Sequence, residues 1–451
     1  MPILPIDTGR YGTPEMRRIF EEETRVQKML DVEAALAWAH AEVGDISKED
    51  AEKIMAVALL KNVKLSRIKE IEREIKHDVA ALVRALSEAC GSSSGCVHLG
   101  ATSYDIVDTA NALQLKEATE LIEKRLIDLE KTLMDKAARY RDTIMIGRTH
   151  GQHALPITLG FKFAVWLREI ARHFQRLKQC EERVLVGKMT GAVGTQAGLG
   201  HHAMQIQELV MRRLGLKAAD ISTQIVQRDR YAELICVNAL IASSLDNFAN
   251  EIRELQRPEI GEMFEAFDVE RQVGSSAMPH KQNPELCERV CGLARIVRSL
   301  SIPGLENVVT WHERDLTQSS TERFLLPESC ILTDYLLFLI NGIIYNLRVD
   351  EQRMLRNMEL TEGRSMSEPV MTALIGKGMN RQEVHELLRK LAIESQAKNI
   401  SFKDVLLENG VVSGKLTREE IEAALNPRNY LGTAVKQIDL IVEKTRKARL
   451  N

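Results

Sequence analysis

Residues 121–133 have the sequence LIEKRLIDLEKTL, in which apolar residues recur at spacings of four, three and four. This period places Ile122, Leu126, Leu129 and Leu133 on one face of an α-helix, as in a helix that packs into a bundle. Similar helical patterns recur over about 157–186, 228–257, 284–301 and 325–347. No alternating run of β-branched residues indicates a major sheet. We therefore predict an all-α protein built on a bundle of long helices.

The composition is that of a globular protein with balanced charge. Of 451 residues, 61 are Lys or Arg and 64 are Asp or Glu, which gives a formal net charge of −3. A chain with this balance and only 4% aromatic residues is poorly suited to hold a polyanion or to stack bases, so we expect no nucleic-acid partner. The 11 prolines and 26 glycines are few for this length, which favours long helices.

The sequence also indicates a cellular compartment. Seven cysteines are scattered with no CxxC pair, so neither a zinc site nor a dithiol is predicted. The first residues, MPILPIDTGRYG, lack the layout of a signal peptide. The most apolar stretch, 331–347, is interrupted by Asp334, Asn341 and Asn346, so no membrane span is expected. A soluble cytoplasmic protein is predicted.

Differences in helix length and glycine content along the sequence predict three domains. The first holds helical stretches from Thr13-Pro14 to near Gly44, over about 47–60 and over about 65–90, with a glycine-rich loop at 91–95. Beyond about residue 362 the helices become shorter and glycines more frequent. The predicted domains are an N-terminal helical domain at 1–105, a central long-helix bundle at 106–361 and a small helical C-terminal domain at 362–451.

Five polar stretches fit neither an ordinary helix nor a linker, and the clearest is GSSAMPHKQNP at 274–284. Its prolines keep the loop out of a helix, and Pro284 can start the helix that follows. Its hydroxyls, lysine and free backbone N–H groups suit a bound anion. On composition alone, a polar surface turn is an equally good interpretation.

The second stretch is GRTHGQH at 147–153, which we expect to form a turn before a helix that starts near Pro156. An imidazole in a turn, here His150, suits proton transfer near neutral pH. Taken alone, the residues favour a structural role for His150. His150 and His153 have no obvious third ligand nearby in the sequence, so a metal site is not predicted.

The remaining three stretches combine charges and hydroxyls. Lys76-His77-Asp78, expected near the middle of a helix, suits an anionic ligand or simply a solvated face. Residues 100–105, GATSYD, form either an anion site at a helix start or a plain cap. Residues 311–323, WHERDLTQSSTER, place Arg314 and Arg323 on either side of several hydroxyls, which suits a phosphate or carboxylate; a charged loop is the alternative. The glycine-rich stretch 187–200 lacks the P-loop pattern and predicts an interhelix connection.

Together these stretches resemble the fumarase/aspartase superfamily, and within it the adenylosuccinate lyase family. GSSAMPHKQNP is similar to the signature loop of the superfamily. Other stretches that fit the family are GRYG at 9–12, KHD at 76–78, GATSYDIVDT at 100–109, GRTHGQHA at 147–154, GAVGTQ at 191–196, STQIVQRDR at 222–230, WHERDLTQSSTER at 311–323 and SEPVMTALIGKGMNRQEVHE at 367–386. The chain departs from many bacterial members at Gln282, where they have Arg, and at 318–320, where they have His-Ser-Ser. These departures concern fine substrate tuning rather than the reaction.

The resemblance implies a fold, an assembly and a reaction. The fold is three mostly helical domains around a central bundle, and the assembly is a homotetramer whose active sites are each shared by three subunits. The reaction is a β-elimination of fumarate from adenylosuccinate, giving AMP, and from the succinyl-carboxamide ribotide SAICAR, giving AICAR. The implied partners are these small-molecule substrates and further copies of the chain. No cofactor and no metal are implied.

The resemblance also implies catalytic roles. Ser275 corresponds to the general base, with Ser276 as the alternative because sequence does not separate two adjacent hydroxyls. His150 corresponds to the general acid, and Glu288 orients it. A serine base has to act as an alkoxide, which loop amides and Lys281 would stabilise.

The implied substrate-binding residues fall into groups. The succinyl carboxylates would be bound by Lys281, Asn283, Thr102, Ser103 and Thr149, with Ser275 beside them. The 5′-phosphate would be bound by Arg10, Tyr11, Arg314, Ser319 and Arg323, and the base or the departing fumaryl group by Gln224. The site would be lined by Lys76, His77 and Asp78, and His77 is also one of the implied catalytic groups.

The same residues bear on three alternative functions. Argininosuccinate lyase and carboxymuconate cycloisomerase are rivals within the superfamily, but neither has a ribotide phosphate for Arg314 and Arg323 to bind. An inactive structural homologue is expected to have lost His150, the serine pair or Lys281, and all are present. A helical scaffold for protein partners would need an exposed apolar surface, which a tetramer would bury, so the apolar helix faces do not discriminate.

Overall fold

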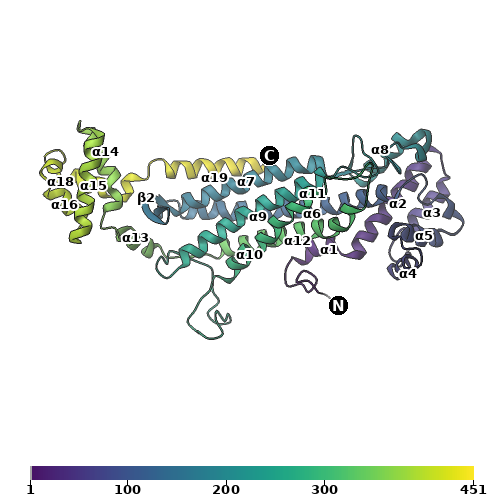
Figure 1. Cartoon of the computed structure of the whole chain (residues 1–451), viewed down its shortest axis with the longest axis horizontal. Helices are drawn as coiled ribbons and strands as arrows, with labels where there is room; N and C mark the ends of the chain where they lie inside the picture. The colour runs from purple at the N-terminus through teal and green to yellow at the C-terminus, as the bar shows by residue number, and fades with distance from the viewer. Residues whose placement is uncertain (1–2, 451) are drawn as a thin grey trace. The chain divides into compact units, whose positions relative to one another are not determined.

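The chain forms two compact units in the computed structural model, which describes residues 3–450. Unit 1 comprises Met1–Ile127, Arg172–Leu245 and Gly292–Phe338; unit 2 comprises Asp128–Ala171, Asp246–Cys291 and Leu339–Asn451. Five helices contribute residues to both units (Figure 1): α6 (Ser103–Arg139), α7 (Leu159–Val184), α9 (Asp229–Gln256), α10 (Glu285–Ser299) and α12 (Thr317–Tyr345). The division into three domains at residues 105 and 361 stays a prediction.

The all-α prediction is confirmed. Strands are short and form three two-stranded sheets. They are β1 (Ile144–Thr149) with β2 (Gln152–Thr158), β3 (Val186–Gly187) with β4 (Lys217–Ala218), and β5 (Met263–Phe264) with β6 (Arg348–Val349). The apolar stripe is fully buried, because Ile122, Leu126, Leu129 and Leu133 all have 0% exposure. The helices expected at 228–257 and 284–301 lie within a few residues of α9 and α10.

The N-terminal helices begin and end partly where the sequence predicts. Thr13 caps the first helix by accepting a hydrogen bond from the Met16 N–H, and Gly44 ends the second with a φ of 88°. The predicted continuous helix from 13 to 44 is interrupted at residues 20–21, and the predicted loop at 91–95 is a 3₁₀ turn. These elements are α1 (Pro14–Ile19), α2 (Glu22–Val43), α3 (Lys48–Val57), α4 (Leu65–Ile75), α5 (Asp78–Cys90) and η1 (Gly91–Cys96).

The prediction of one helix over 65–90, with Lys76-His77-Asp78 near its middle, is wrong. Lys76 adopts the left-handed conformation with a φ of 57° and ends α4. His77 then caps α5, because its Nδ1 accepts a hydrogen bond from the Ala80 N–H at 3.3 Å. The apolar period continues on both sides of this break, so the pattern alone did not reveal it.

Two other helix starts differ from the prediction. The helix expected near Pro156 begins only at Leu159, because residues 152–158 form strand β2. Helix α12 begins at Thr317 rather than near residue 325, so the hydroxyl-rich stretch forms its first turns instead of a loop.

The C-terminal part has the short helices expected after residue 362. Within unit 2, a core around Val370, Leu374, Phe402 and Leu406 holds them together. The elements are α13 (Glu351–Glu359), η3 (Arg364–Met366), α14 (Ser367–Gly376), α15 (Arg381–Lys398), α16 (Phe402–Glu408), α17 (Gly410–Ser413), α18 (Arg418–Leu425), η4 (Pro427–Tyr430) and α19 (Ala434–Leu450). The connection expected at 187–200 follows α7 and leads through η2 (Ala197–His202) into α8 (Ala203–Leu214). Helix α11 (Ser301–Glu306) follows α10.

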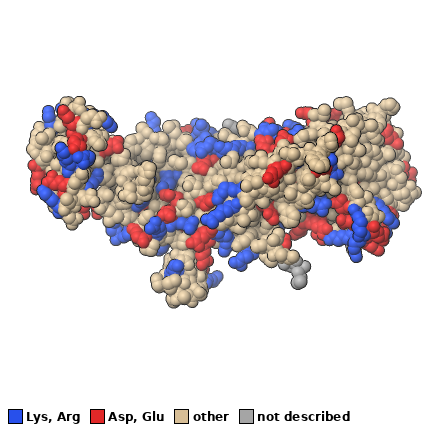
Figure 2. Space-filling view, in the orientation of Figure 1, with Lys and Arg blue, Asp and Glu red and all other residues tan. Residues whose placement is uncertain are grey.

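Helix α12 is the one described helix that is long and apolar enough to cross a membrane, with a mean hydropathy of 1.4 over its most apolar window. It extends beyond the interrupted stretch 331–347 that the sequence analysis considered. Because 67% of that window is buried inside the protein, α12 has the surroundings of a core helix. On the face drawn in Figure 2, Lys and Arg side chains are interspersed with Asp and Glu.

Candidate active site

A cavity of about 910 Å³ in unit 1 gathers eight of the predicted site residues. Its walls come from the break between α4 and α5, the start of α6, the loop before α9 and the first turns of α12. The predicted residues that line it are Lys76, His77, Asp78, Ser103, Gln224, Arg314, Ser319 and Arg323. Four segments that are far apart in the sequence therefore meet at one place within unit 1.

An ion pair joins the α4–α5 break to α12. Asp78, the first residue of α5, accepts a hydrogen bond from Arg323 at 2.7 Å. Burial alone would raise the pKa of the Asp78 carboxyl, but the hydrogen bond from the Val79 N–H and the charges of Arg323 and Arg25 outweigh it and hold that pKa below its usual value. One side of the Arg323 guanidinium is thus fixed, while the side chain is still 52% exposed.

Arg314 is held by an aromatic ring and an amide. Its guanidinium lies 3.6 Å from the centre of the Tyr104 ring, and its Nη1 donates to Gln224 Oε1 at 2.8 Å. Tyr104 in turn donates its hydroxyl to Ser319 Oγ at 2.8 Å. These contacts orient the cationic and polar groups of the cavity without a ligand.

The loop before α12 is ordered by Asp315. Its carboxylate accepts hydrogen bonds from the N–H groups of Trp311 and Thr317, each at 2.7 Å, and from the Thr317 hydroxyl. The Thr317 hydroxyl, followed by these two backbone N–H groups, lowers the pKa of Asp315 to about 2. The carboxylate therefore stays ionised and caps α12 at any ordinary pH.

A buried ion cluster lies behind the cavity wall. Arg228 donates to both carboxylate oxygens of Asp108 on α6, at 2.9 and 3.0 Å, and to both oxygens of Glu322 on α12, at 2.6 and 3.1 Å. The Arg228 side chain is 1% exposed. Burial would lower its pKa, but the two carboxylates raise it well above the usual value, so the guanidinium stays charged. This cluster fixes the turn of α12 that carries Arg323.

The cavity-wall residues without a role predicted from the sequence include Arg25 and Tyr104, although Tyr104 lies within the GATSYD stretch. Arg25 lies on α2, within an ordinary amphipathic pattern, so no local signal distinguishes it. Three predicted residues of unit 1 do not line the cavity. The N–H of Thr102 donates to Asp105 just before α6, and Arg10 and Tyr11 lie in an N-terminal turn where the Tyr11 ring is 6.0 Å from that of Tyr335.

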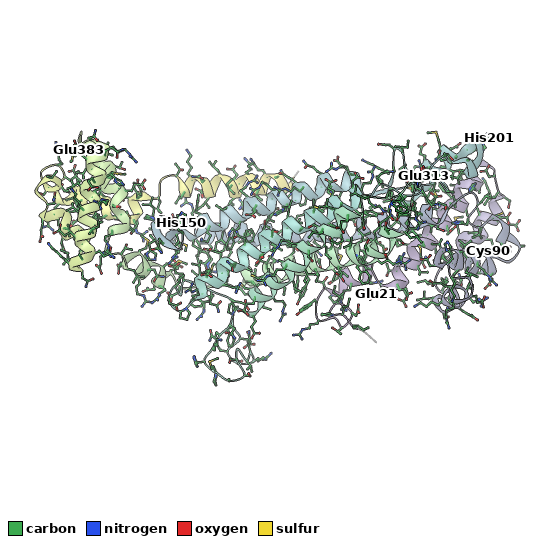
Figure 3. The ribbon with its side chains drawn as sticks, in the orientation of Figure 1. Glu21, Cys90, His150, His201, Glu313 and Glu383 are labelled. Carbon is green, nitrogen blue, oxygen red and sulfur yellow. The ribbon has the colours of Figure 1, made fainter. Side chains whose placement is uncertain are left out.

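The other predicted residues belong to unit 2, where Thr149 and His150 lie at a hairpin. His150 and Gly151 form the two-residue turn between β1 and β2, with φ values of 53° and 73°. Positive φ at both positions is the requirement of a type I′ turn, and histidine is among the residues that accept it. His150 is exposed at this turn, where Figure 3 labels it. No pattern in the sequence predicted the hairpin.

The hairpin has a firm anchor below its turn. Arg148 donates to both oxygens of the fully buried Glu262, at 2.8 and 2.7 Å. The nearby His153 is partly buried, and burial, followed by the charge of Arg148, lowers its pKa. The hairpin therefore presents His150 from a fixed base.

The signature loop lies between β5 and α10 and extends away from the helices that it joins (Figure 1). Ser275 Oγ accepts hydrogen bonds from the N–H groups of Ala277 and Met278, at 3.3 and 3.0 Å. Asn283 Nδ2 donates to Gly274 O at 2.7 Å and closes the base of the loop. A Cβ at Gly274 would lie 2.1 Å from Lys281 O, so only glycine fits there. Ser276 and Lys281 are exposed.

Glu288 is exposed on α10. Burial would lower the pKa of Arg253 on α9, but the hydrogen bond to Cys291 and, after it, the charge of Glu288 raise it above its usual value. Within residues 3–450, no hydrogen bond joins Glu288 to His150. Over the same residues, no group of three His, Cys, Asp or Glu side chains is arranged to hold a metal ion.

Comparisons with known proteins cover nearly the whole chain. A family model described as "Lyase" matches residues 9–298, and one described as "Adenylosuccinate lyase C-terminus" matches residues 363–441. A curated protein named "Adenylosuccinate lyase" from Pyrococcus abyssi is 52% identical over 442 residues, covering 98% of each chain. Another with that name from Methanocaldococcus jannaschii is 48% identical, covering 98% of this chain and 96% of that one.

Solved structures have the same fold. A fumarate lyase from Mesorhizobium sp. BNC1 matches with a TM-score of 0.90 and 31% identity, covering 98% of this chain and 100% of that one. A 3-carboxy-cis,cis-muconate lactonizing enzyme from Pseudomonas putida matches with a TM-score of 0.90 and 34% identity, covering 98% of this chain and 99% of that one.

Proposed function

The chain is a lyase and belongs to the adenylosuccinate lyase family of the fumarase/aspartase superfamily, and from this premise we propose that it releases fumarate by β-elimination from two ribotides. The substrates are adenylosuccinate, which gives AMP, and SAICAR, which gives AICAR. The observation that carries this proposal is the cavity of unit 1, in which Lys76 of the α4–α5 break meets Arg314 and Arg323 of α12 and the loop before it.

Substrate charge complements the cavity. Each ribotide carries a phosphate and two carboxylates, and guanidinium groups bind such anions through pairs of hydrogen bonds. We assign the 5′-phosphate to Arg314, Ser319 and Arg323, with Arg10 and Tyr11. Thr102 and Ser103 lie at the N-terminus of α6, where the helix dipole favours a succinyl carboxylate, and Lys281, Asn283 and Thr149 complete that site. Gln224 contacts the base or the departing fumaryl group, and Lys76, His77 and Asp78 line the wall.

The proton on the carbon next to a succinyl carboxylate is removed by Ser275. Two backbone N–H groups already point at its Oγ, and the same donors would stabilise the alkoxide that must accept the proton. Ser276 lacks such donors among the described residues, so the geometry favours Ser275. Lys281 adds a cation to the loop.

The C–N bond then breaks, and the departing nitrogen takes a proton from His150. The electron pair of the broken C–H bond forms the double bond of fumarate. Before that, the excess negative charge on the succinyl group is stabilised by the cations and donors assigned to its carboxylates, usually the largest catalytic contribution. Glu288 orients His150.

We also propose a homotetramer in which each active site draws on three subunits. Large apolar side chains remain exposed on the bundle helices, including Ile296, Ile302, Phe338 and Tyr345, as expected for helices that pack against further copies. Such an assembly lets the hairpin and loop of some copies complete the cavity of another. The cytoplasm is the proposed location, where the ribotide substrates are metabolised.

The decisive test is to incubate the protein with adenylosuccinate and follow the ultraviolet change as AMP forms, with argininosuccinate and carboxymuconate as control substrates. His150→Ala is expected to lower kcat about 10³-fold. The control is His201→Ala, which changes an exposed histidine of η2, just before α8, and should leave kcat unchanged. No turnover of adenylosuccinate by the folded wild type would refute the proposed function. Turnover that survives in His150→Ala would refute only the assignment of the acid.

A further inference from the structure

Arg25 of α2 is a cavity residue to which neither the sequence motifs nor the proposed reaction gave a role. It lines the cavity of about 910 Å³ and also a smaller one of about 200 Å³ in the same unit. Arg323, Ser319 and Tyr104 line both cavities too, so the two spaces adjoin where these side chains meet. Arg25 therefore stands at the α12 end of the proposed substrate site.

The guanidinium of Arg25 has no partner of its own in the part of the chain that the structure describes: it makes no hydrogen bond and no ion pair there. The two carboxylates whose charges act on Arg25, those of Asp78 and Glu22, have other partners. Asp78 accepts hydrogen bonds from Arg323 and Val79, and Glu22 pairs with Lys69. Burial, followed by the charge of Arg323, lowers the pKa of Arg25, yet an arginine stays protonated at neutral pH.

This arrangement is unfavourable unless a ligand completes it. A half-buried guanidinium offers five N–H donors, and donors without acceptors lose their hydration without compensation. The second guanidinium, on Arg323, repels the first. An anion with two charges and several acceptor oxygens, placed between the two, would remove both penalties at once.

We propose that Arg25 binds the 5′-phosphate of the ribotide together with Arg323 and Ser319. This inference rests on the proposed function. Position favours the phosphate over a succinyl carboxylate: the smaller cavity is lined by Arg25 with Ser319 and Arg323, two of the residues assigned to the phosphate, and not by Ser103, which is assigned to a succinyl carboxylate. Arg25 is thus grouped with the residues assigned to the phosphate.

The test compares Arg25→Met with Arg25→Lys and with the control Arg18→Met. Arg18 is exposed on α1 and lines neither cavity, so the control removes the same charge from a neighbouring helix. Inhibition constants of the two products, AMP and fumarate, are measured separately against adenylosuccinate. Arg25→Met should weaken AMP binding and raise KM about 10- to 100-fold, leaving fumarate inhibition and kcat within about threefold. Arg25→Lys should recover part of the loss, and Arg18→Met should match the wild type.

Thermal unfolding separates this role from a structural one. Without ligand, Arg25→Met should melt at or above the temperature of the wild type, because it removes a partly buried guanidinium that makes no hydrogen bond or ion pair among the described residues; the rise that AMP causes in the wild type should be largely lost. A lower melting temperature without ligand, unchanged AMP inhibition, or a loss confined to fumarate inhibition would each overturn the inference. If the wild type neither turns over adenylosuccinate nor binds AMP, both the proposed function and this inference are refuted. If the wild type does both, but Arg25→Met binds AMP as well as the wild type does, only this inference is refuted.

Discussion

The cavity of unit 1 and the signature loop of unit 2 are built in opposite ways. Most of the cavity's charged side chains are held in advance: Asp78 holds Arg323, and behind the wall Arg228 ties Asp108 to Glu322. The loop is largely exposed, and a hydrogen bond from Asn283 to Gly274 closes its base. A binding site gains affinity from preorganisation, whereas a catalytic loop has to let substrate in before it excludes water. Substitutions in the first region should therefore cost stability or affinity, and those in the second should cost rate.

The largest effect is expected at the loop. Ser275→Ala should lower kcat about 10³- to 10⁴-fold, equivalent to about 4–5 kcal/mol, because it removes the general base. Its melting temperature should stay that of the wild type, since the side chain bonds only to its own loop. Ser276→Ala is the matched control and should lose less than tenfold. Steady-state kinetics and thermal unfolding check both; the reverse ranking would assign the base to Ser276.

The second effect concerns stability. Arg228→Met leaves the buried carboxylates of Asp108 and Glu322 without a cation and should lower the free energy of unfolding by about 3–4 kcal/mol, measured by urea denaturation. Arg183→Met serves as control, because Arg183 pairs with Glu233 at a half-exposed site, and should cost less than about 1 kcal/mol. Equal losses in the two variants would show that the cluster behind the cavity is not the anchor inferred here.

The third effect is a pH dependence of the stability of unit 1. A hydrogen bond of 2.7 Å joins His173 Nε2 on α7 to Ser244 Oγ. Burial, followed by the charges of Arg176 and Arg172, lowers the pKa of His173 from 6.5 to about 4. Between about pH 6.5 and pH 4, His173 is protonated in the unfolded chain but neutral in the folded chain. The free energy of unfolding therefore falls as the pH drops from 6.5 towards 4, by up to roughly 3 kcal/mol.

Urea unfolding at pH 7 and pH 4.5 tests this sign. His173→Gln has no proton to gain, so its stability should fall less than that of the wild type over this interval. If the two proteins lose the same amount, the acid sensitivity of unit 1 arises elsewhere.

The smallest effect is expected at the base of the loop. Asn283→Ala removes the hydrogen bond to Gly274 O and should lower kcat about tenfold with an unchanged melting temperature. Gln282→Ala, next to it, is the control and should behave like the wild type. A rise in KM without a change in kcat would show that Asn283 acts only as the proposed ligand of a succinyl carboxylate and not by closing the loop.

Much of this protein follows from local sequence patterns. The period of Ile122, Leu126, Leu129 and Leu133 correctly predicted a buried helix face, because side chains three and four residues apart share one side of any α-helix. Seven of the side chains that line one cavity lie in polar stretches that stand out in the sequence, and an eighth, Gln224, was assigned only through the resemblance; their roles stay predictions. Such signals are readable because they depend only on neighbours along the chain.

Other features were decided by the tertiary structure. The break at Lys76 and the turn at His150 need positive φ angles that packing imposes on residues with no strong local preference for them. Whether an arginine is paired, as Arg228 is, or unpartnered, as Arg25 is among the described residues, depends on which helices meet, and helix faces of equal period do not encode their partners. The sequence alone thus determined that long helices form and where most of them lie; long-range packing decided which charges face one another and which remain open to a ligand.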